Sequence, residues 1–186
     1  MRDDDKLPIK ITVIYGSPHK SGTTSKSLEK FLHSIKEENS ISYFDAYEMS
    51  PKPCIDCKKC KESFKCIYND LDNLYESVIS CDLLVIASPI YNASFPAPLK
   101  SIIDRMQPFY FLKKNKVQKN ITPKNSVIIT TQGSNLDYGS CLKKQILPNL
   151  KLLGVKDIKF LNIKNTDNPF FDIDKLYLKS KIYPSV

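Results

Sequence analysis

The sequence predicts an α/β protein in which a five-stranded, doubly wound parallel sheet is covered by helices on both faces. Three observations support this fold class. Apolar runs of strand length alternate with segments of helical periodicity, no internal repeat or linker interrupts them, and 186 residues suffice for one domain with a proper core. A chain of this length commonly takes the strand order 2-1-3-4-5. We therefore expect one domain over residues 1–186.

Five apolar runs are expected to form the strands, and the segments between them the helices. The expected strands cover residues 9–15, 41–44, 82–87, 126–131 and 158–163. The expected helices present the apolar faces Leu28, Phe31, Leu32 and Ile35; Leu71, Leu74, Tyr75 and Val78; Leu99, Ile102, Ile103 and Met106; and residues 142–153. Asn69 or Asp70 is expected to cap the second helix, and a terminal helix is expected over 172–182.

Composition and charge narrow the class of protein. The N-terminal residues show no signal-peptide pattern, and the longest apolar run, Leu83–Ala87, is too short to span a bilayer, so we expect a cytoplasmic protein with no membrane partner. The net charge of +8 comes from scattered lysines, and the densest run, residues 113–124, lacks interleaved aromatic residues. We interpret this run as a solvated loop and expect no nucleic-acid partner. Docking of an acidic redox partner or an anionic substrate is the alternative.

Polar loops follow the first, third and fourth strands, at the sheet edge where doubly wound proteins bind ligands. The first, "GSPHKSGTTS" (Gly16–Ser25), joins glycines and five hydroxyl side chains to a helix N-terminus, which suits a phosphate. It lacks the Gly-Lys-Ser/Thr of a triphosphate loop and the dinucleotide pattern G-x-G-x-x-G. A monophosphate is therefore the expected ligand, and an ordinary capped turn is the alternative.

The other two loops complete the expected site. In "SPIYNASFP" (Ser88–Pro96), two prolines stiffen a backbone that can face a flat ring, and Tyr91 and Asn92 add an aromatic face and an amide. "QGSN" (Gln132–Asn135) follows the fourth strand. Three polar loops at one edge, one of them suited to a phosphate, indicate flavin mononucleotide (FMN).

Over residues 9–131 the chain resembles the NADPH-dependent FMN reductase family of flavodoxin-like proteins, including its iron–sulfur flavoprotein branch. Residues 16–25 are similar to the family's phosphate loop, GSPRKxGNT, and residues 88–105 to its ring-binding loop and following helix. The resemblance implies FMN as the cofactor and NAD(P)H as the electron donor. It places Ser17, His19, Thr23, Thr24 and Ser25 around the phosphate, Pro89, Ile90, Tyr91, Asn92 and Ala93 at the isoalloxazine ring, and Gln132 and Gly133 in the third loop.

Some residues depart from the family's pattern. His19 stands where arginine is usual and Thr23 where asparagine is usual, so phosphate affinity is expected to be lower or pH-sensitive. The family often has two acids after its last cysteine, and here only Asp70 is acidic. Residues 102–105, "IIDR", resemble a segment often near the dimer interface, from which we expect a homodimer or tetramer. An amphipathic helix end is the alternative reading of that segment.

Four cysteines lie in a loop at about residues 50–68. Cys54, Cys57, Cys60 and Cys66 have the spacing C-x2-C-x2-C-x5-C. Overlapping C-x2-C spacings are typical of loops around Fe–S clusters, whereas zinc sites more often use two separated pairs. In the resembling family, such motifs hold a [4Fe–4S] cluster in the iron–sulfur flavoproteins. Plain or redox-active thiols and zinc remain as alternatives, and Lys58, Lys59, Lys61 and Lys65 suit all three.

The position of the cysteines in the chain leads to two further expectations. Since their loop follows the second strand, which neighbours the first, they should emerge at the flavin's edge of the sheet. Cys81 and Cys141, which lie in or beside helices, are expected to be core thiols.

The leading prediction is an enzyme, namely an FMN-dependent oxidoreductase that passes electrons from NAD(P)H to a quinone, a flavin or another small acceptor. No residue stands out as an acid or base catalyst, and Tyr91 is a candidate for shaping the pocket. One alternative is an iron–sulfur flavoprotein that transfers electrons with ferredoxin. A further alternative is a zinc-binding interaction module.

Overall fold

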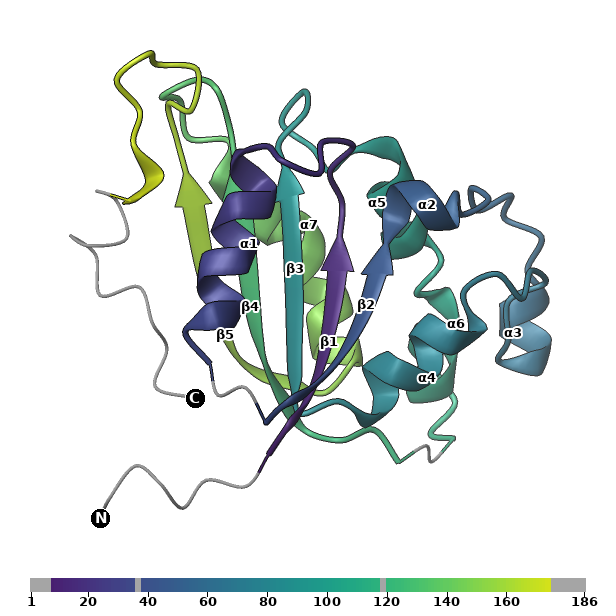
Figure 1. Cartoon of the computed structure of the whole chain (residues 1–186). Coiled ribbons are helices and arrows are strands. Elements are labelled where there is room, and N and C mark those ends of the chain that lie inside the picture. The colour runs from purple at the N-terminus through teal and green to yellow at the C-terminus, as the bar shows by residue number, and fades with distance from the viewer. Residues whose placement is uncertain (1–7, 36–37, 118–119, 175–186) are drawn as a thin grey trace.

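The computed structural model describes residues 8–35, 38–117 and 120–174. Its strands form one sheet in which every neighbouring pair is parallel (Figure 1). They are β1 (Lys10–Tyr15), β2 (Ser40–Asp45), β3 (Leu83–Pro89), β4 (Lys124–Thr131) and β5 (Val155–Ile163), in the order β2-β1-β3-β4-β5. The predicted fold class and strand order are therefore confirmed.

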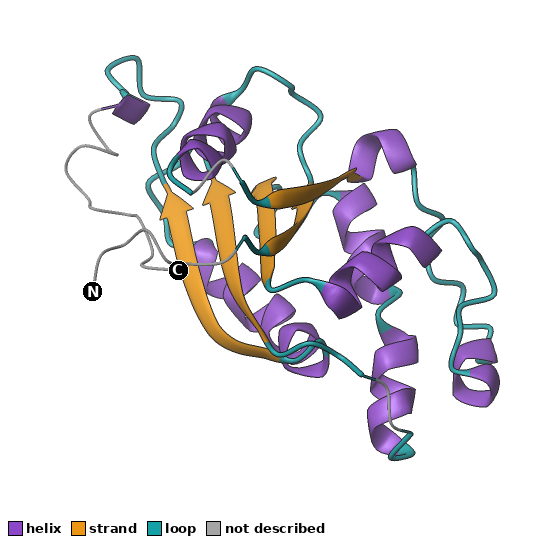
Figure 2. Ribbon diagram, turned by 60° about the horizontal axis from the view of Figure 1, so that its bottom comes forward, coloured by secondary structure: helices purple, strands orange, loops and turns teal. Residues whose placement is uncertain are grey.

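The helices cover both faces of the sheet (Figures 1 and 2). Those in the described ranges are α1 (Thr23–His33), α2 (Ala46–Met49), α3 (Lys59–Ser63), α4 (Asp72–Ser80), α5 (Ala97–Asp104), α6 (Gln107–Lys114) and α7 (Gly139–Leu152). α1 packs on one face, and α4, α5, α6 and α7 form the core on the other. None of these helices is long and apolar enough to cross a membrane. The expected terminal helix lies almost entirely outside the described residues.

The central strand β3 is buried on both faces. Leu83 and Val85 pack in the cluster that contains α1, whereas Leu84 and Ile86 pack in the cluster formed by the opposite helices. Successive side chains of a strand point to opposite faces, so a strand between two helix layers needs an apolar residue at every position. This requirement explains the uninterrupted apolar run in the sequence.

The lysine-rich run differs from the solvated loop that we expected. Lys113 and Lys114 belong to the last turn of α6, and Lys124 is buried at the start of β4. The Lys124 ammonium donates to the carbonyl oxygens of Thr122 and Leu153 at 2.5 and 3.0 Å. Burial lowers the pKa of Lys124. Residues 115–117 and 120 are exposed and outside helices and strands, as predicted. The prediction failed for Lys124 because these carbonyls, one of them at the end of α7, make burial of the charge tolerable.

The two isolated cysteines have different environments. Cys81 is a buried core thiol, as expected, but Cys141 is exposed. The buried side of α7 passes through Leu142 and Ile146, at helical spacing, and Cys141 lies beside that stripe rather than on it. The prediction of a core position for Cys141 is therefore wrong.

The start of α4 also differs from the prediction. Leu71 occupies the N-cap position, and neither Asn69 nor Asp70 caps the helix with its side chain. Asp70 instead forms an ion pair with Arg105, which is the better partner for a carboxylate than a backbone N–H group.

Candidate functional site

The carboxyl ends of β1, β3 and β4 bring the three predicted flavin loops together. Tyr15 pairs with Ala87, and Pro89 pairs with Thr131, so the three strands end close to one level. Two backbone hydrogen bonds continue the ladder into the loops, from Gly16 N to Ala87 O and from Ile90 N to Thr131 O, both at 2.8 Å. The sheet therefore fixes where each loop begins.

Gly16 is required at the start of the first loop because a larger residue has no room there. A Cβ atom at this position would lie 2.6 Å from Leu99 Cδ2 and 3.2 Å from Ser88 Oγ, and both of these residues are buried. The loop ends at Gly22, the N-cap of α1, where no side chain caps the helix and no acid lies in the first turn. An uncapped helix N-terminus with hydroxyl groups around it is suited to an anion.

The hydroxyl groups of the first loop have different roles. Ser17 is buried and accepts a hydrogen bond from His19 N at 3.2 Å. Thr24 is also buried and shares a 2.6 Å hydrogen bond with Thr131 Oγ1, which ties α1 to the end of β4. Ser25 donates to Glu29 Oε1 at 2.8 Å, so its hydroxyl must rotate before it can serve a phosphate.

His19 and Lys20 connect the first loop to neighbouring parts of the protein. The imidazole of His19 is on the exposed side, while its carbonyl accepts a 2.6 Å hydrogen bond from the hydroxyl of buried Tyr15. The Lys20 ammonium pairs with the buried carboxylate of Asp45 and, at 2.7 Å, with Glu48. These contacts join the loop to the end of β2, and they leave Lys20 committed to carboxylates.

The second loop contains a tight two-residue turn. Tyr91 and Ser94 exchange backbone hydrogen bonds of 3.0 and 2.9 Å, and the residues between them, Asn92 and Ala93, have φ values of 50° and 55°. Positive φ at both central positions is the type I′ conformation, which is unfavourable for alanine. Gln145 of α7 holds the turn, since it accepts from Ser94 Oγ at 3.2 Å and donates to Ala93 O at 3.3 Å.

Exposure of the second loop fits a ligand-facing role. Pro89, Ile90 and Ala93 are half-buried, whereas Asn92 and Tyr91 are exposed, Tyr91 to 41%. An aromatic ring and an amide therefore stand free at the sheet edge, on a backbone that is fixed at both ends.

The third loop is organised by the side chain that begins it. Gln132 is buried, and its amide nitrogen donates to Ser134 O at 2.9 Å and to Leu136 O at 2.5 Å. Gly133 lies against Asp167, which leaves no room for a Cβ atom. The Oε1 atom of Gln132 accepts a hydrogen bond from Asn162 Nδ2 of β5 at 3.3 Å. The Gln132 side chain is thus occupied, and the backbone is the part of this loop that is available to a ligand.

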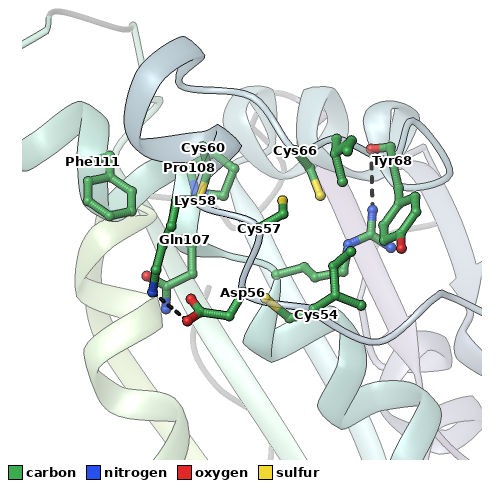
Figure 3. A pocket seen from close by; sticks show the side chains of 13 residues that line it. Cys54, Asp56, Cys57, Lys58, Cys60, Cys66, Tyr68, Gln107, Pro108 and Phe111 are labelled. Carbon is green, nitrogen blue, oxygen red and sulfur yellow. Dashed lines mark hydrogen bonds and ion pairs between the residues drawn. The ribbon is translucent and has the colours of Figure 1, made fainter.

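The four clustered cysteines surround one cavity of about 150 Å³ (Figure 3). Apolar side chains, among them Ile55, Ile67, Pro108 and Phe111, complete its wall. The loop leaves the sheet edge through α2 (Figure 1). α3 packs against α6, and no described residue of the three flavin loops is among those that line the cavity. The cysteines therefore lie beside the start of α6 and not at the flavin edge where we expected them, because the long loop carries them away from β2.

The thiols of this cavity are spaced around it. Burial, and then the charges of the other three cysteines, raise the pKa of Cys60. The described residues contain no group of three or more His, Cys, Asp or Glu side chains arranged around a single metal ion. Lys58 pairs with Asp56, and Lys59 lies 3.7 Å from Glu62.

The sequence analysis missed one charged residue at this cavity. Arg105 is only 2% exposed, lines the cavity and binds the carboxylate of Asp70 through both terminal nitrogens, at 2.8 and 2.5 Å. It follows the buried residues Ile102 and Ile103 at the end of α5, so an arginine on an otherwise apolar face was the available signal. The segment that we linked to a subunit interface thus has its arginine inside the chain.

Comparison with known proteins identifies the family to which the sequence is similar. The profile of the NADPH-dependent FMN reductase family matches residues 9–172. An iron–sulfur flavoprotein of Methanocaldococcus jannaschii is 33% identical over 113 residues, which are 59% of this chain and 58% of that protein. An iron–sulfur flavoprotein of Methanosarcina thermophila is 33% identical over 116 residues, which are 59% of this chain and 60% of that protein.

The solved structures show a shared fold. An NAD(P)H:quinone oxidoreductase from Methanothermobacter marburgensis superposes with a TM-score of 0.73 at 17% identity, covering 90% of this chain and 88% of that chain. The matches to the curated relatives are shorter, since the chain spans about half to three fifths of their length.

Proposed function

This chain belongs to the NADPH-dependent FMN reductase family, and we propose that it is an FMN-dependent oxidoreductase that takes electrons from NAD(P)H and passes them to a quinone, a flavin or another small acceptor. The observation that carries the proposal is the meeting of three loops at one sheet edge, where an uncapped helix N-terminus lies next to a stiff, exposed turn. Solved structures named as quinone reductases and azoreductases share the fold.

The residues at this edge fit the two ends of FMN. The phosphate would lie at the N-terminus of α1, with backbone N–H groups and the predicted residues Ser17, His19, Thr23, Thr24 and Ser25 around it. The isoalloxazine ring would lie against Pro89, Ile90, Tyr91, Asn92 and Ala93, with Gln132 and Gly133 contributing their backbone. When bound, FMN supplies the hydride and electron transfer, for which no side chain need act as an acid or a base.

The protein's own contribution is position and shape. The type I′ turn fixes the backbone amides of Asn92 and Ala93, and the exposed ring of Tyr91 limits how an acceptor can approach. Because Gln145 and the sheet hold this turn from both sides, it is ready before any ligand binds.

The proposal is tested by adding FMN to purified protein, recording fluorescence and absorption, and then following NADH and NADPH oxidation with a small quinone. We expect stoichiometric flavin and acceptor-dependent oxidation of a reduced nicotinamide. Binding of flavin without any oxidation would favour a non-enzymatic electron carrier. Absence of flavin binding would refute the proposal.

The cysteine cavity favours a second candidate, an iron–sulfur flavoprotein that exchanges electrons with ferredoxin. Four thiols around one cavity match the donor set of a [4Fe–4S] cluster, in which each iron takes one cysteine. The aligned relatives named iron–sulfur flavoproteins support this reading. Iron and sulfide analysis of anaerobically purified protein is the test, with about four of each per chain expected.

The zinc-binding module receives less support. A zinc ion draws its sulfur ligands to about 2.3 Å, so a formed site has its thiols around one point. Among the described residues, no such group of ligands exists, and the four sulfur atoms enclose a larger space. Stoichiometric zinc in protein that takes up neither iron nor flavin would reverse this preference.

A further inference from the structure

Arg105 occupies an unusual place for a charged residue. It follows the last turn of α5 and is buried within the chain, with its side chain on the wall of the cysteine cavity. Its backbone carbonyl accepts a 2.6 Å hydrogen bond from the buried hydroxyl of Tyr75. This hydrogen bond fixes the backbone of Arg105 independently of the contacts that its side chain makes.

The guanidinium group joins the two ends of the cysteine loop. One terminal nitrogen donates to Lys52 O at 3.2 Å, and the other donates to Tyr68 O at 3.3 Å. Both nitrogens also bind Asp70. Lys52 lies two residues before Cys54 and Tyr68 two residues after Cys66, so one side chain closes the loop around all four cysteines.

The first part of the loop is exposed, whereas its second part packs on the core through α3, Phe64 and Cys66. Residues 52–59 are all exposed, and Asp56, Lys58 and Phe64 have positive φ values of 53°, 63° and 57°. Such conformations are unfavourable for residues other than glycine and persist only where the surroundings impose them. In the described part of the loop, the contacts of Arg105 are the main polar link to the body of the protein.

One donor of Arg105 is left over. Its Nε atom is the only buried side-chain nitrogen or oxygen in the described residues that has no hydrogen-bond partner. Burial lowers the pKa of Arg105, but hydrogen bonding to Asp70 outweighs it, and the pKa ends above its usual value. A buried N–H group without a partner is costly unless a bound group accepts it.

We propose that Arg105 is the positioning residue of the four-cysteine site: it closes the cysteine loop through Lys52, Tyr68 and Asp70, and its Nε–H group serves sulfur at the Cys66 end of the cavity. The inference rests on the iron–sulfur candidate described above. A lysine cannot replace this side chain, because an ammonium group has no rigid fork that reaches both loop ends and a third acceptor.

Two measurable consequences follow. Partners behind metal ligands fix the orientation of those ligands, so the loop should open more readily without Arg105. Hydrogen bonds to cluster sulfur and nearby positive charge stabilise the reduced cluster, so loss of Arg105 should lower its reduction potential. The second effect does not arise from a purely structural role.

The first measurement uses cluster-free protein and limited digestion with trypsin, since the loop carries four lysines. Wild type, Arg105→Lys and Arg105→Gln are compared, with Asp104→Asn as a control that breaks only the exposed ion pair with Lys100. Loss of charged hydrogen bonds should speed cleavage within residues 58–65 by about tenfold in both Arg105 variants and leave the control unchanged. FMN binding equal to that of wild type shows that the variants are folded.

The second measurement uses the same proteins after anaerobic reconstitution with iron and sulfide. The cluster is titrated with dithionite and followed by electron paramagnetic resonance. We expect the highest potential in wild type and in Asp104→Asn, an intermediate value in Arg105→Lys, and the lowest in Arg105→Gln.

The outcomes separate this inference from the proposed function. Equal potentials in all reconstituted proteins would overturn the inference even if cleavage is faster, because Arg105 would then be a structural residue only. Wild-type protein that takes up flavin but no iron would refute the iron–sulfur candidate and the inference with it, while the FMN-dependent activity would stand. Iron uptake with a potential that falls as described supports both.

Discussion

The loops after β1, β3 and β4 start directly from hydrogen-bonded strands, whereas the cysteine loop runs from α2 to α4 with mostly exposed residues. In the first region, the register of the sheet sets the positions of Gly16, Ile90 and Gln132 through backbone bonds. In the second, the side chain of Arg105 holds the loop ends. The flavin edge is therefore part of the folded core, and the cysteine site is attached to it.

This difference implies that the two regions can fail separately. A ladder of backbone hydrogen bonds is lost only when the sheet itself opens, but a loop whose ends are joined through one side chain can open locally. Damage to the flavin edge should therefore weaken FMN binding, while damage at Arg105 or Asp70 should open the cysteine loop and leave FMN binding unchanged.

The largest effect is expected from Gly16→Val. The added side chain would collide with Leu99 and Ser88 in a packed interior, which should lower the free energy of unfolding by about 3 kcal/mol. The displaced loop should also weaken FMN binding by more than about tenfold. Urea denaturation and flavin fluorescence titration measure the two effects.

Gly16→Ala serves as the graded partner of this variant, since it adds one methyl group at the same place and should show a smaller loss of both quantities. Iron uptake by the folded fraction should stay at the wild-type level. A strong loss of iron would contradict the separation of the two regions.

A smaller effect is expected from Asp70→Asn, which leaves the buried guanidinium of Arg105 without its carboxylate. Removing one partner of a buried pair is costly, and partial exposure of Asp70 reduces the penalty to about 2 kcal/mol at pH 7. Asp104→Asn, which breaks an exposed pair, should change the unfolding free energy by less than about 0.5 kcal/mol.

The Asp70 effect should depend on pH with a defined sign. Hydrogen bonding from Arg105 lowers the pKa of Asp70 in the folded protein, so the carboxylate stabilises the fold above its unfolded pKa and loses this contribution as pH falls through the lower folded value. The difference between wild type and Asp70→Asn should therefore shrink below about pH 4. A difference that stays constant from pH 7 to pH 3 would rule out the ion pair as its source.

The fold and the meeting of three loops at one sheet edge were predictable because their signals are local. The apolar run of β3 and the helical spacing of Leu28 and Phe31 each report burial within a few residues of sequence. In a parallel sheet, the loops after the strands necessarily meet at one edge. The placement of the predicted FMN residues at a bound flavin stays a prediction.

The remaining features depend on contacts between distant residues. Arg105 binds Asp70, which is 35 residues earlier, and no local sequence pattern around either residue predicts that the two form a pair. The path of the cysteine loop toward α6 likewise depends on packing, so the sequence indicated four candidate ligands but not their separation from the flavin loops.

A moderate effect is expected from Gln145→Ala at the flavin edge. The variant removes two neutral hydrogen bonds to Ser94 and Ala93, which should lower the unfolding free energy by about 1 kcal/mol. The freed turn should weaken FMN binding about fivefold, since part of the binding energy must then order it. Substitution of the exposed neighbour, Lys144→Ala, is the matched control. Equal FMN affinities in the two variants would show that the turn keeps its conformation without the contacts of Gln145.

The smallest effect, and one of opposite sign, is expected from Ala93→Gly. Alanine is unfavourable at a φ of 55°, whereas glycine adopts this conformation freely, so the substitution should raise the unfolding free energy by about 0.5 kcal/mol after the greater entropy of the unfolded chain is included. Ala97→Gly, which removes the same methyl group from the start of α5, should instead be neutral or destabilising. If Ala93→Gly also destabilises the protein, the turn does not hold its conformation in solution, and the flavin edge is less rigid than the sheet that carries it.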